Sequence, residues 1–541
     1  MHMILQFIWT TGKKLSGKFL HFCFIDFIHD IKMNEIPLFK VYMNEQVGKM
    51  VENTLLSGMI TQSHKVEEFE NKLKEYFNHP YVLTLNSATS GLTLAYRLLN
   101  LQPTEKVISS PLTCFATTCA TLANTKNIVW ADTDLETCNI NLESVKKLLS
   151  HETRILTIVH WGGNPVNLDI IEELKIYARN TYNINLEIIE DCAHAFGSEW
   201  NGKKIGTHGN ICVFSLQAIK HLTTGDGGLI LLPNKELYKR AKLLRWYGID
   251  REHRSKPGTD FRLESDIQEW GYKFHMNDIC ATIGLANLPD IPKIIEKCRE
   301  NAVWFDKNIC TKNIHIFKRN TKSNPSFWIY TIRVKHGLKP FFLDYMKNNG
   351  IVVSQVHGRN DKHSCVSFLS TPLPNLDLLE KEIVSIPCGW WVTENDRNRI
   401  LKRILDFDDM YTPKITLITE KYFNEYILLL SEMNSFLGNN PTFTDEMLSQ
   451  IYILTINNEI ISSGKLYIEN KIYEPIGHIE DIVTKKSKRG FGHGKTIVKH
   501  LSNVALEKGC YKIVLNAKNE LRYFYEQCGY ESTGIFFTKR K

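Results

Sequence analysis

The chain of 541 residues has no cysteine pair at C-x-x-C spacing and no histidine and cysteine cluster at zinc-binding spacing. Its thirteen cysteines, an odd number, are scattered along the sequence. These absences exclude a small scaffold held by disulfides and give no signature of a metal site. The pattern is typical of a cytoplasmic protein with reduced, mostly buried thiols.

Long hydrophobic runs are also lacking. Residues 1–39 contain two apolar stretches, but Gly-Lys-Lys at 12–14 interrupts the first and Asp26 the second. Neither reaches the roughly 20 residues that span a bilayer, and a signal peptide carries its charges before its apolar stretch. The segment is either an extra amphipathic helix or sequence upstream of a true start at Met33. We favour the second interpretation, because chemistry-bearing sequence begins just after Met33. We therefore treat 1–32 as an extension and expect no membrane partner.

No run of basic residues stands out. Lysine and arginine number 66 against 59 for aspartate and glutamate, which gives a net charge of +7. A protein that binds nucleic acid usually concentrates its positive charge, so we expect no nucleic acid and, at most, anionic small substrates. Internal repeats and low-complexity tracts are absent. With 43% hydrophobic and 23% charged residues the chain is typical of a folded protein, and its length suits about three or four domains.

Short apolar runs alternate with helical patterns over residues 33–300, which predicts a large α/β domain with a mostly parallel sheet. The runs are YVLTL (81–85), KVISS (106–110), NIVWAD (127–132), RILTIVH (154–160), LEIIED (186–191) and ICVFS (211–215). Residues 301–410 indicate a smaller α+β lobe, whose last helix begins at Thr393 with Asp396 as its capping partner. The polar stretch 406–414 is interpreted as a linker. Residues 411–541 then form a further α/β domain of ordinary size.

The stretch FSLQAIKHLTTGDGG (214–228) places Lys220 shortly after the end of a strand. A single lysine is usually a solvated surface residue, but other strand ends carry matching chemistry. NSATSG (86–91) precedes a helical pattern, and hydroxyl residues with free N–H groups at a helix N-terminus can cradle a phosphate. EDCAHAFG (190–197) puts Asp191 at the carboxyl end of a strand, where open α/β sheets bind ligands.

These features match the needs of pyridoxal phosphate, which are a lysine that binds it covalently, an acid for its ring nitrogen and a phosphate cup. Lys220 and Asp191 are the candidates for the lysine and the acid. The candidates for the cup are Ser87, Thr89 and Ser215. In this interpretation Asp191 keeps the ring nitrogen protonated, while Lys220 is displaced by the incoming amine and then moves a proton between carbons. HWGG (160–163) places His160 at the end of one more strand.

From about residue 36 to 408 the sequence resembles the DegT-type nucleotide-sugar aminotransferases, which have the fold-type I architecture of aspartate aminotransferase. The matching segments run in the family's order: IPLFKVYMNEQ, NSATSG, VISSPLTCFATTCATLANTKNIVWADTD, HWGG, EDCAHAFGS, FSLQAIK, RWYGIDR and GYKFHMNDICATIGLANL. The resemblance implies pyridoxal phosphate as cofactor, a nucleotide-linked keto-deoxy-sugar as substrate and glutamate as amino donor. The form FSLQAIKHLTT is nearer to the branch that aminates C4 of 4-keto-6-deoxy sugars than to the 3-keto branch.

The resemblance also implies roles for single residues. Lys220 binds the cofactor, and Asp191 contacts its ring nitrogen. His194 matches a histidine that follows this aspartate in many members. His275 stands where the family commonly has arginine or asparagine, supplied by the other subunit of a homodimer towards the phosphate. The residues that bind the phosphate are Ser87, Ala88, Thr89 and Ser215.

The chain departs from the family pattern at one position, and two alternatives to an active aminotransferase have to be considered. Where relatives often carry an aromatic that stacks on the cofactor, this chain has Cys114 with Phe115 beside it, so the stacking residue is open. Some members replace the lysine by histidine and are dehydratases, and Lys220 argues against that branch. A pseudoenzyme that binds the cofactor and regulates another protein is an alternative. The presence of every principal cofactor group favours an active enzyme.

A second constellation lies within residues 477–530. The sequence predicts a strand over 477–484, the loop KSKRGFGHGK and a helix over 493–508 with one apolar face. Glycines at a helix N-terminus let a pyrophosphate approach the backbone, and Arg489 and Lys495 add positive charge. A dinucleotide site, the alternative, needs a strand, then G-x-G-x-x-G and an acid about 20 residues on. The order of features here does not fit that pattern well.

This segment resembles acetyl-CoA-dependent N-acetyltransferases of the GNAT superfamily, and among them the glucosamine-phosphate N-acetyltransferases, through GHIEDIV, RGFGHGK, GCYKIVL and FYEQCGY. The residues implied to bind the pyrophosphate of acetyl-CoA are Arg489, Gly490, Gly492, Gly494 and Lys495. Tyr525 matches the tyrosine that assists the departing thiolate, although a tyrosine packed on a sheet is often only structural. Glu480 and Asp481 match an acidic pair near the acceptor amine. Asn516 and Ala517 replace an Asp-Cys pair, which indicates a changed acceptor.

Together the two constellations predict two consecutive steps, amination of a nucleotide-linked sugar and acetylation of the new amine. The alternative is a working aminotransferase with an acyl-CoA-binding module that regulates or scaffolds it. Product analysis with both cosubstrates present separates these two functions.

Overall fold

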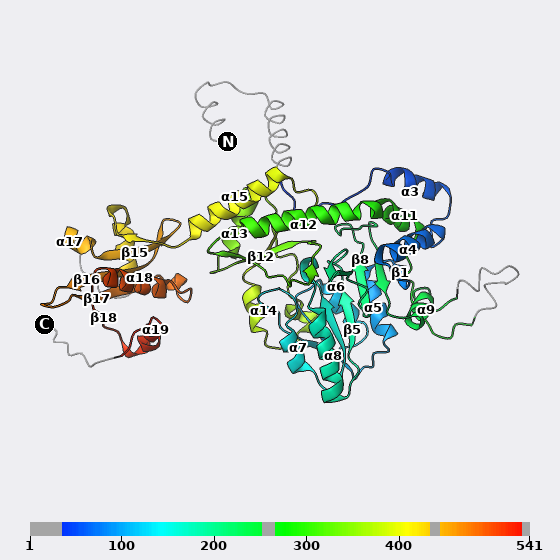
Figure 1. The fold of residues 1–541 in the computed structure, drawn as a ribbon, viewed down its shortest axis with the longest axis horizontal. Coiled ribbons are helices and arrows are strands. Elements are labelled where there is room, and N and C mark those ends of the chain that lie inside the picture. Colours follow the sequence, from blue (N-terminus) through cyan, green and yellow to red (C-terminus); the bar gives the residue numbers. More distant parts are fainter. Residues whose placement is uncertain (1–34, 251–265, 370, 433–443, 533–541) are drawn as a thin grey trace, which may run out of the picture. The chain divides into compact units, whose positions relative to one another are not determined.

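The computed structural model describes residues 35–250, 266–369, 371–432 and 444–532. The predicted extension 1–32 and the start proposed at Met33 lie outside these residues. Contacts divide the chain into two compact units, of which the first ends at Ile404 and the second begins at Leu405. Each unit is described by itself (Figure 1).

A seven-stranded sheet forms the centre of the first unit, in the order β1-β9-β8-β5-β4-β2-β3. Its strands are β1 (Val82–Leu85), β2 (Lys106–Ser109), β3 (Ile128–Trp130), β4 (Thr153–Val159), β5 (Glu187–Asp191), β8 (Ile211–Ser215) and β9 (Gly228–Leu231). Six of them coincide with the six predicted runs, and only β9 runs against the others. The prediction of a mostly parallel sheet is therefore confirmed, while β9 was missed.

Helices cover both faces of this sheet, which is why its strands are mostly apolar on both sides. On one face, Leu156 and Ile158 pack with α4, α7 and α8, whereas on the other Ile155 and Ile189 pack with α5, α6 and α9. The helices of this part are α3 (Val47–Leu56), α4 (His64–Phe77), α5 (Ala88–Leu98), α6 (Phe115–Leu122), α7 (Leu142–Leu148), α8 (Leu168–Tyr182), α9 (Lys235–Leu244) and α11 (Asp278–Asn287).

A smaller lobe completes the first unit. Its sheet has the order β10-β12-β13. A short further sheet, in the order β11-β6-β7, pairs β11 of the smaller lobe with β6 and β7 of the large lobe. The elements are β6 (Glu199–Trp200), β7 (Lys203–Lys204), α12 (Ile291–Asn308), β10 (Ile314–Ile316), β11 (Ser323–Asn324), β12 (Tyr330–Val334), α13 (Lys339–Asn348), α14 (Pro374–Leu379), β13 (Ile383–Ile386) and α15 (Glu394–Tyr411).

The predicted start of α15 is confirmed, but the predicted linker 406–414 is wrong. Thr393 and Asp396 form the reciprocal capping pair, with the Asp396 N–H 3.2 Å from the Thr393 hydroxyl and the Thr393 N–H 3.0 Å from the Asp396 carboxylate. The helix continues to Tyr411, and β14 begins at Lys414. Phe407 explains the difference, because its ring is fully buried and stacks on Tyr411 at 4.4 Å.

The second unit is built on a five-stranded sheet in the order β14-β15-β16-β17-β18, in which only β17 and β18 are parallel. Helix α18 packs on this sheet through Ile497, Val498 and Leu501, as its predicted apolar face requires. The elements are β14 (Lys414–Leu417), α16 (Phe423–Ser431), α17 (Asp445–Leu448), β15 (Ile451–Ile456), β16 (Glu459–Glu469), β17 (Ile476–Thr484), α18 (His493–Glu507), β18 (Lys512–Leu515) and α19 (Arg522–Glu526).

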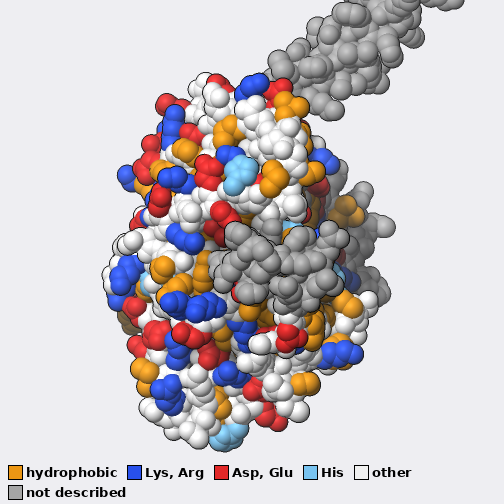
Figure 2. Space-filling model, turned by 90° about the vertical axis from the view of Figure 1, so that its right-hand side faces the viewer, with side chains coloured by type: hydrophobic (Ala, Val, Ile, Leu, Met, Phe, Trp, Pro, Cys, Tyr) orange, Lys and Arg blue, Asp and Glu red, His pale blue; other side chains and the backbone are white. Residues whose placement is uncertain are grey.

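Across the ranges that the structure describes, every helix is too short or too polar to cross a bilayer. Figure 2 shows one face, on which basic, acidic and hydrophobic side chains are mixed rather than gathered by type.

Candidate active sites

Lys220 and Asp191 both lie at the carboxyl edge of the large sheet. Strands β5 and β8 are parallel neighbours, so Asp191 at the end of β5 lies close to the segment that follows β8. The Asp191 carboxylate is buried and accepts hydrogen bonds from the Thr117 hydroxyl at 2.7 Å and the Ala193 N–H at 3.0 Å. Burial lowers the pKa of Lys220 to about 7, against the opposing attraction of Asp191. Burial also raises the pKa of Asp191, while its hydrogen bonds and Lys220 oppose that shift.

The alternation of side chains along the strands decides which groups share this site. Asp191 follows Ile189 by two residues, and Ser215 follows Val213 by two, so both point to the face covered by α5 and α6. His160 instead points to the opposite face, where its Nε2 lies 2.8 Å from Glu190 and its Nδ1 accepts the Val166 N–H at 3.0 Å. His160 is therefore a buried structural group apart from Lys220.

A group with the spacing of metal ligands lies at the same place on the opposite face. His160, Glu190 and Cys192 bring their ligand atoms within 4.8 Å of one another. The second carboxylate oxygen of Glu190 accepts a hydrogen bond from the Asn210 amide at 2.7 Å. Hydrogen bonds therefore account for the polar atoms of this cluster, and it gives no reason to assign a metal.

The predicted phosphate cup assembles around Gly228. Ser87 caps helix α5 by accepting the Ser90 N–H at 3.1 Å, which leaves Ala88 and Thr89 in the first turn. Strand β9 runs between β1 and β8 and pairs Gly228 with Ser215. A Cβ atom on Gly228 would lie 2.5 Å from the Ala88 nitrogen, so only glycine fits there. The structure thus brings Ser87, Ala88 and Ser215 to one place at the N-terminus of α5.

Two aromatic residues of the smaller lobe join the site, and the sequence analysis missed both. Trp328 places its ring centroid 3.4 Å from the Lys220 Nζ and stacks on His194 at 4.0 Å. His194 is buried, accepts the Gly162 N–H on Nδ1 at 3.3 Å and has its Nε2 3.3 Å from the Nε2 of His357. More than one hundred residues separate Trp328 and His357 from Lys220, so no local pattern marked them.

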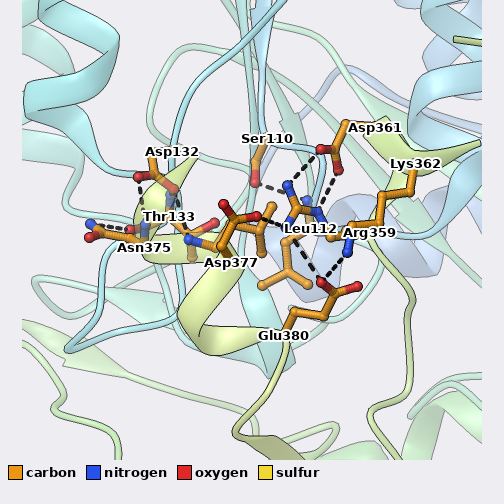
Figure 3. A network of polar contacts seen from close by, with 11 residues as sticks. Ser110, Leu112, Asp132, Thr133, Arg359, Asp361, Lys362, Asn375, Asp377 and Glu380 are labelled. Atoms are coloured by element: carbon orange, nitrogen blue, oxygen red, sulfur yellow. Dashed lines mark hydrogen bonds and ion pairs between the residues drawn. The ribbon is translucent and has the colours of Figure 1, made fainter. Parts of the chain in front are cut away.

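An ion-pair network fixes the segment that carries His357 (Figure 3). Arg359 binds Asp361 at 2.7 Å, and it also pairs with Asp377 and with Glu380. These carboxylates hold the pKa of Arg359 above its ordinary value. Beside it, the Asp132 carboxylate accepts N–H groups at the start of α14, at 3.0 Å. The network thereby anchors the loop of the smaller lobe to the large lobe.

His275 lies next to the cup within its own chain. Its backbone pairs with Leu85, and its ring lies 3.7 Å from that of Trp246, measured between centroids. With Asn86 it borders a surface pocket of about 470 Å³. Its predicted role across a subunit interface stays a prediction. Phe115, beside Cys114, makes an edge contact with His363 at 4.9 Å. Among the described residues, the ring with a recorded contact to Lys220 is that of Trp328.

The second unit has a pocket of about 880 Å³ that collects its predicted site residues. The predicted residues that line it are Glu480, Asp481, Arg489, Gly490, Gly492, Gly494, Lys495 and Tyr525. Asn516 and Ala517, the positions that depart from the glucosamine-phosphate enzymes, also line it. The sequence pattern therefore located a real cavity.

Strand separation and glycine conformations open this pocket. Strands β17 and β18 pair only from Ile476 to Ile479, and beyond that point they part. Asp481 then adopts φ of 51°, which turns the strand. Gly492 caps α18 with φ of 85°, a conformation that suits glycine. The Arg489 side chain donates to the Thr484 carbonyl at 3.0 Å, and burial raises the pKa of Tyr525.

Comparison with known proteins agrees with this geometry. The model of the DegT/DnrJ/EryC1/StrS aminotransferase family matches residues 41–405, and that of the acetyltransferase (GNAT) family matches 420–530. The crystal structure of AtS13 from Actinomadura melliaura is similar at 41% identity and a TM-score of 0.66, covering 69% of this chain and 98% of that one. The sugar aminotransferase CalS13 from Micromonospora echinospora is similar at 37% identity and a TM-score of 0.66, covering 69% and 99%.

Two relatives with named activities match the same region. GDP-perosamine synthase of Escherichia coli O157:H7 is 30% identical over 308 residues, 56% of this chain and 78% of that protein. UDP-4-amino-4,6-dideoxy-N-acetyl-beta-L-altrosamine transaminase of Campylobacter jejuni subsp. jejuni serotype O:23/36 is 35% identical over 258 residues, 47% of this chain and 64% of that protein. The chain belongs to the DegT/DnrJ/EryC1/StrS aminotransferase family and carries a C-terminal GNAT acetyltransferase domain.

Proposed function

We propose that the chain is a bifunctional nucleotide-sugar enzyme. It aminates a nucleotide-linked keto-deoxy-sugar with glutamate as donor and then acetylates the new amine from acetyl-CoA. We assign the first reaction to lobes 33–300 and 301–410 and the second to domain 411–541. The observation that carries the proposal is the arrangement at one edge of the sheet, where buried Asp191 ends β5 and Ser215 ends the neighbouring β8 just before Lys220, beside the N-terminus of α5.

The residues of the first site fit pyridoxal phosphate. The cofactor would supply an electron sink for a carbanion next to nitrogen. Asp191 would hold a proton on the ring nitrogen, and Lys220, whose low pKa leaves much of its amine neutral near pH 7, would bind the cofactor and carry the proton between carbons. The N-terminus of α5 with Ser87 and Ser215 would hold the phosphate. The backbone approach at Gly228, which a Cβ would block, supports this assignment.

The names of the relatives support amination at C4. One is a perosamine synthase, and the other is a transaminase named for a 4-amino-4,6-dideoxy sugar. The motif FSLQAIKHLTT agrees with these names, and together they support a 4-keto-6-deoxyhexose as substrate. We expect the 4-keto sugar to be used in preference to a 3-keto sugar.

The second pocket fits acetyl transfer to an amine. Arg489, Lys495 and the N-terminus of α18 would bind the pyrophosphate of acetyl-CoA. Glu480 lies in the same pocket and would face the acceptor amine. Because burial raises the pKa of Tyr525, its hydroxyl stays protonated and can give a proton to the departing thiolate. Asn516 and Ala517 support an amino sugar on a nucleotide, rather than glucosamine 6-phosphate, as the acceptor.

A homodimer is part of the proposal. Apolar side chains that are exposed in the single chain cluster just before the cup, namely Val41, Met43, Leu55, Leu56, Met59 and Ile60. Ile60 and His275 border one pocket, which supports a shared site between two subunits. Leu56→Lys should convert the dimer to a monomer in sedimentation velocity, whereas Leu506→Lys, which changes an exposed leucine of the other unit, should not. A wild-type monomer with full activity would contradict the shared site.

Mass spectrometry of the product tests the whole function. The full chain, given a nucleotide-linked 4-keto-6-deoxyhexose, glutamate and pyridoxal phosphate, should form the amino sugar, and acetyl-CoA should then add one acetyl group. An amino sugar that never gains the acetyl group would support the alternative, in which the GNAT domain is an acyl-CoA-binding or scaffolding module. Faster acetylation of glucosamine 6-phosphate than of the nucleotide-linked amine would refute the coupled reaction.

A further inference from the structure

Trp328 contacts two successive residues at the centre of the first site. It lies between β11 and β12 in the smaller lobe and is only 5% exposed. Its indole N–H donates to the Ile219 carbonyl at 2.9 Å, and its ring centroid lies 3.4 Å from the Lys220 Nζ. The Trp328 side chain therefore contacts both the carbonyl of the residue before Lys220 and the Lys220 amine.

The groups around Trp328 and the Lys220 amine are mostly uncharged. His194 and Phe39 stack on Trp328, at 4.0 and 5.0 Å between centroids. Burial lowers the pKa of His194 and holds that of His357 near 4, so both imidazoles are neutral at pH 7. Burial lowers the pKa of His221 to about 4, so it is likewise neutral, and Asp191 is the carboxylate whose attraction favours the charged form of Lys220. A cation held on an indole face is stabilised, most strongly where water is excluded.

The backbone before Trp328 is held in an unusual conformation. Phe327 has φ of 51°, which is rare for a bulky residue and needs support from its surroundings. Ser326 supplies that support, because its N–H and its hydroxyl bond to the hydroxyl of Ser198 at 3.1 and 2.9 Å. The fold thus fixes the indole against the large lobe through a conformation that carries strain.

We propose that Trp328 is the positioning residue for Lys220, a role that rests on the proposed amination. Its ring covers the amine and limits it to one place, and its N–H fixes the backbone of the preceding residue. A lysine side chain is otherwise flexible, with about 2 kcal/mol of rotamer entropy. Transamination needs the same amine to leave and return to one position, so a displaced Lys220 slows the reaction.

Two substitutions separate the ring face from mere bulk. Trp328→Phe keeps an aromatic face, whereas Trp328→Leu fills space without one. We expect Trp328→Leu to lower kcat of amination about 10-fold or more while KM for the sugar changes little, and Trp328→Phe to stay within about 3-fold of the wild type. The matched control is Trp390→Leu, since Trp390 holds Lys40 at 5.4 Å in a second contact of the same kind. It should leave amination unchanged.

A second readout needs no catalysis. In the cofactor-free full chain, trace acetic anhydride followed by peptide mass spectrometry reports how accessible each lysine is. Trp328→Leu should speed labelling of Lys220 about 3-fold or more, because it uncovers the amine and removes the contact that favours the ammonium. Trp390→Leu should speed labelling of Lys40 alone.

The outcomes separate the two hypotheses. If both Trp328 variants match the wild type in labelling and in kcat, the positioning role is wrong. If Trp328→Leu and Trp328→Phe lose kcat equally, the aromatic face is not the cause and the part of the role assigned to the ring is refuted, because both variants lack the indole N–H that binds the Ile219 carbonyl. If the wild type makes no amino sugar but Lys220 labelling responds as expected, the proposed function fails while the contact with Trp328 stands.

Discussion

At the scale of single residues, burial changes the chemistry of Lys220. Burial lowers the pKa of its ammonium to about 7, because few groups near it can replace the water it has lost. Asp191 offsets part of this effect. A lysine that is neutral in large part near pH 7 is a nucleophile, whereas an exposed one, with a pKa of about 10.4, is not.

Removal of this amine gives the first prediction. Lys220→Ala should abolish amination and the visible absorbance of the lysine-bound cofactor, because no other amine takes its place. Acetylation of a supplied amino sugar by the same preparation should persist, because it belongs to the second unit, and an unchanged melting temperature of the first unit controls for its folding. Amination by the purified variant would refute the assignment of Lys220.

The pKa of Lys220 gives the second prediction. Its rate of labelling in the cofactor-free chain should rise as pH rises through about 7 and level off above it, because the neutral amine is the reacting form. Exposed Lys72 should still gain reactivity at pH 9. Parallel profiles for the two lysines would show that burial does not lower the pKa of Lys220.

At the scale of elements, the cup depends on the close approach of β9 to the start of α5. Gly228→Ala would place a Cβ 2.5 Å from backbone atoms of Ser87 and Ala88. Relief of such a contact costs about 1–3 kcal/mol, and the shift would move the cup. We expect weaker binding of pyridoxal phosphate, measured by equilibrium dialysis. Gly202→Ala is the comparison: it has open space around it but a φ of 75°, so alanine is strained there too, away from the cup, and binding should stay unchanged.

The loop before α18 gives the corresponding prediction for the second unit. Arg489→Ala should weaken acetyl-CoA binding about 10-fold or more in calorimetry, since a charge-assisted hydrogen bond contributes about 1.5–3 kcal/mol. Lys508→Ala, which removes a charge at the C-terminal end of α18, should have little effect. Equal losses in the two variants would indicate general electrostatics rather than a site at Arg489.

At the scale of the whole molecule, the two units should function separately. A fragment of residues 405–541 should fold and bind acetyl-CoA, because its core is contained within it. A fragment of residues 412–541 should melt at a lower temperature, because it loses the buried Phe407 and the bond from the Asn457 N–H to the Met410 carbonyl at 3.0 Å. Equal melting temperatures would show that the end of α15 does not stabilise the second unit.

The amino-acid sequence by itself determined the fold class, and it named the residues that the structure brings together at two places. The six predicted strands were found because a strand buried on both faces is continuously apolar, which is a local property. Asp191 and Lys220 were found because their strand ends meet at one edge of any parallel sheet. The R-x-x-G-x-G loop likewise lies on consecutive residues from 489 to 494, and its pocket is there in the structure.

Only the tertiary structure decided which distant side chains complete the first site. Trp328 and His357 reach Lys220 because the smaller lobe folds back on the large one, and no local spacing encodes that contact. The face to which each strand residue points separated His160 from Asp191. Burial of Phe407 likewise turned a polar stretch into helix. In each case the deciding interaction joins residues through packing, which sequence periodicity does not record.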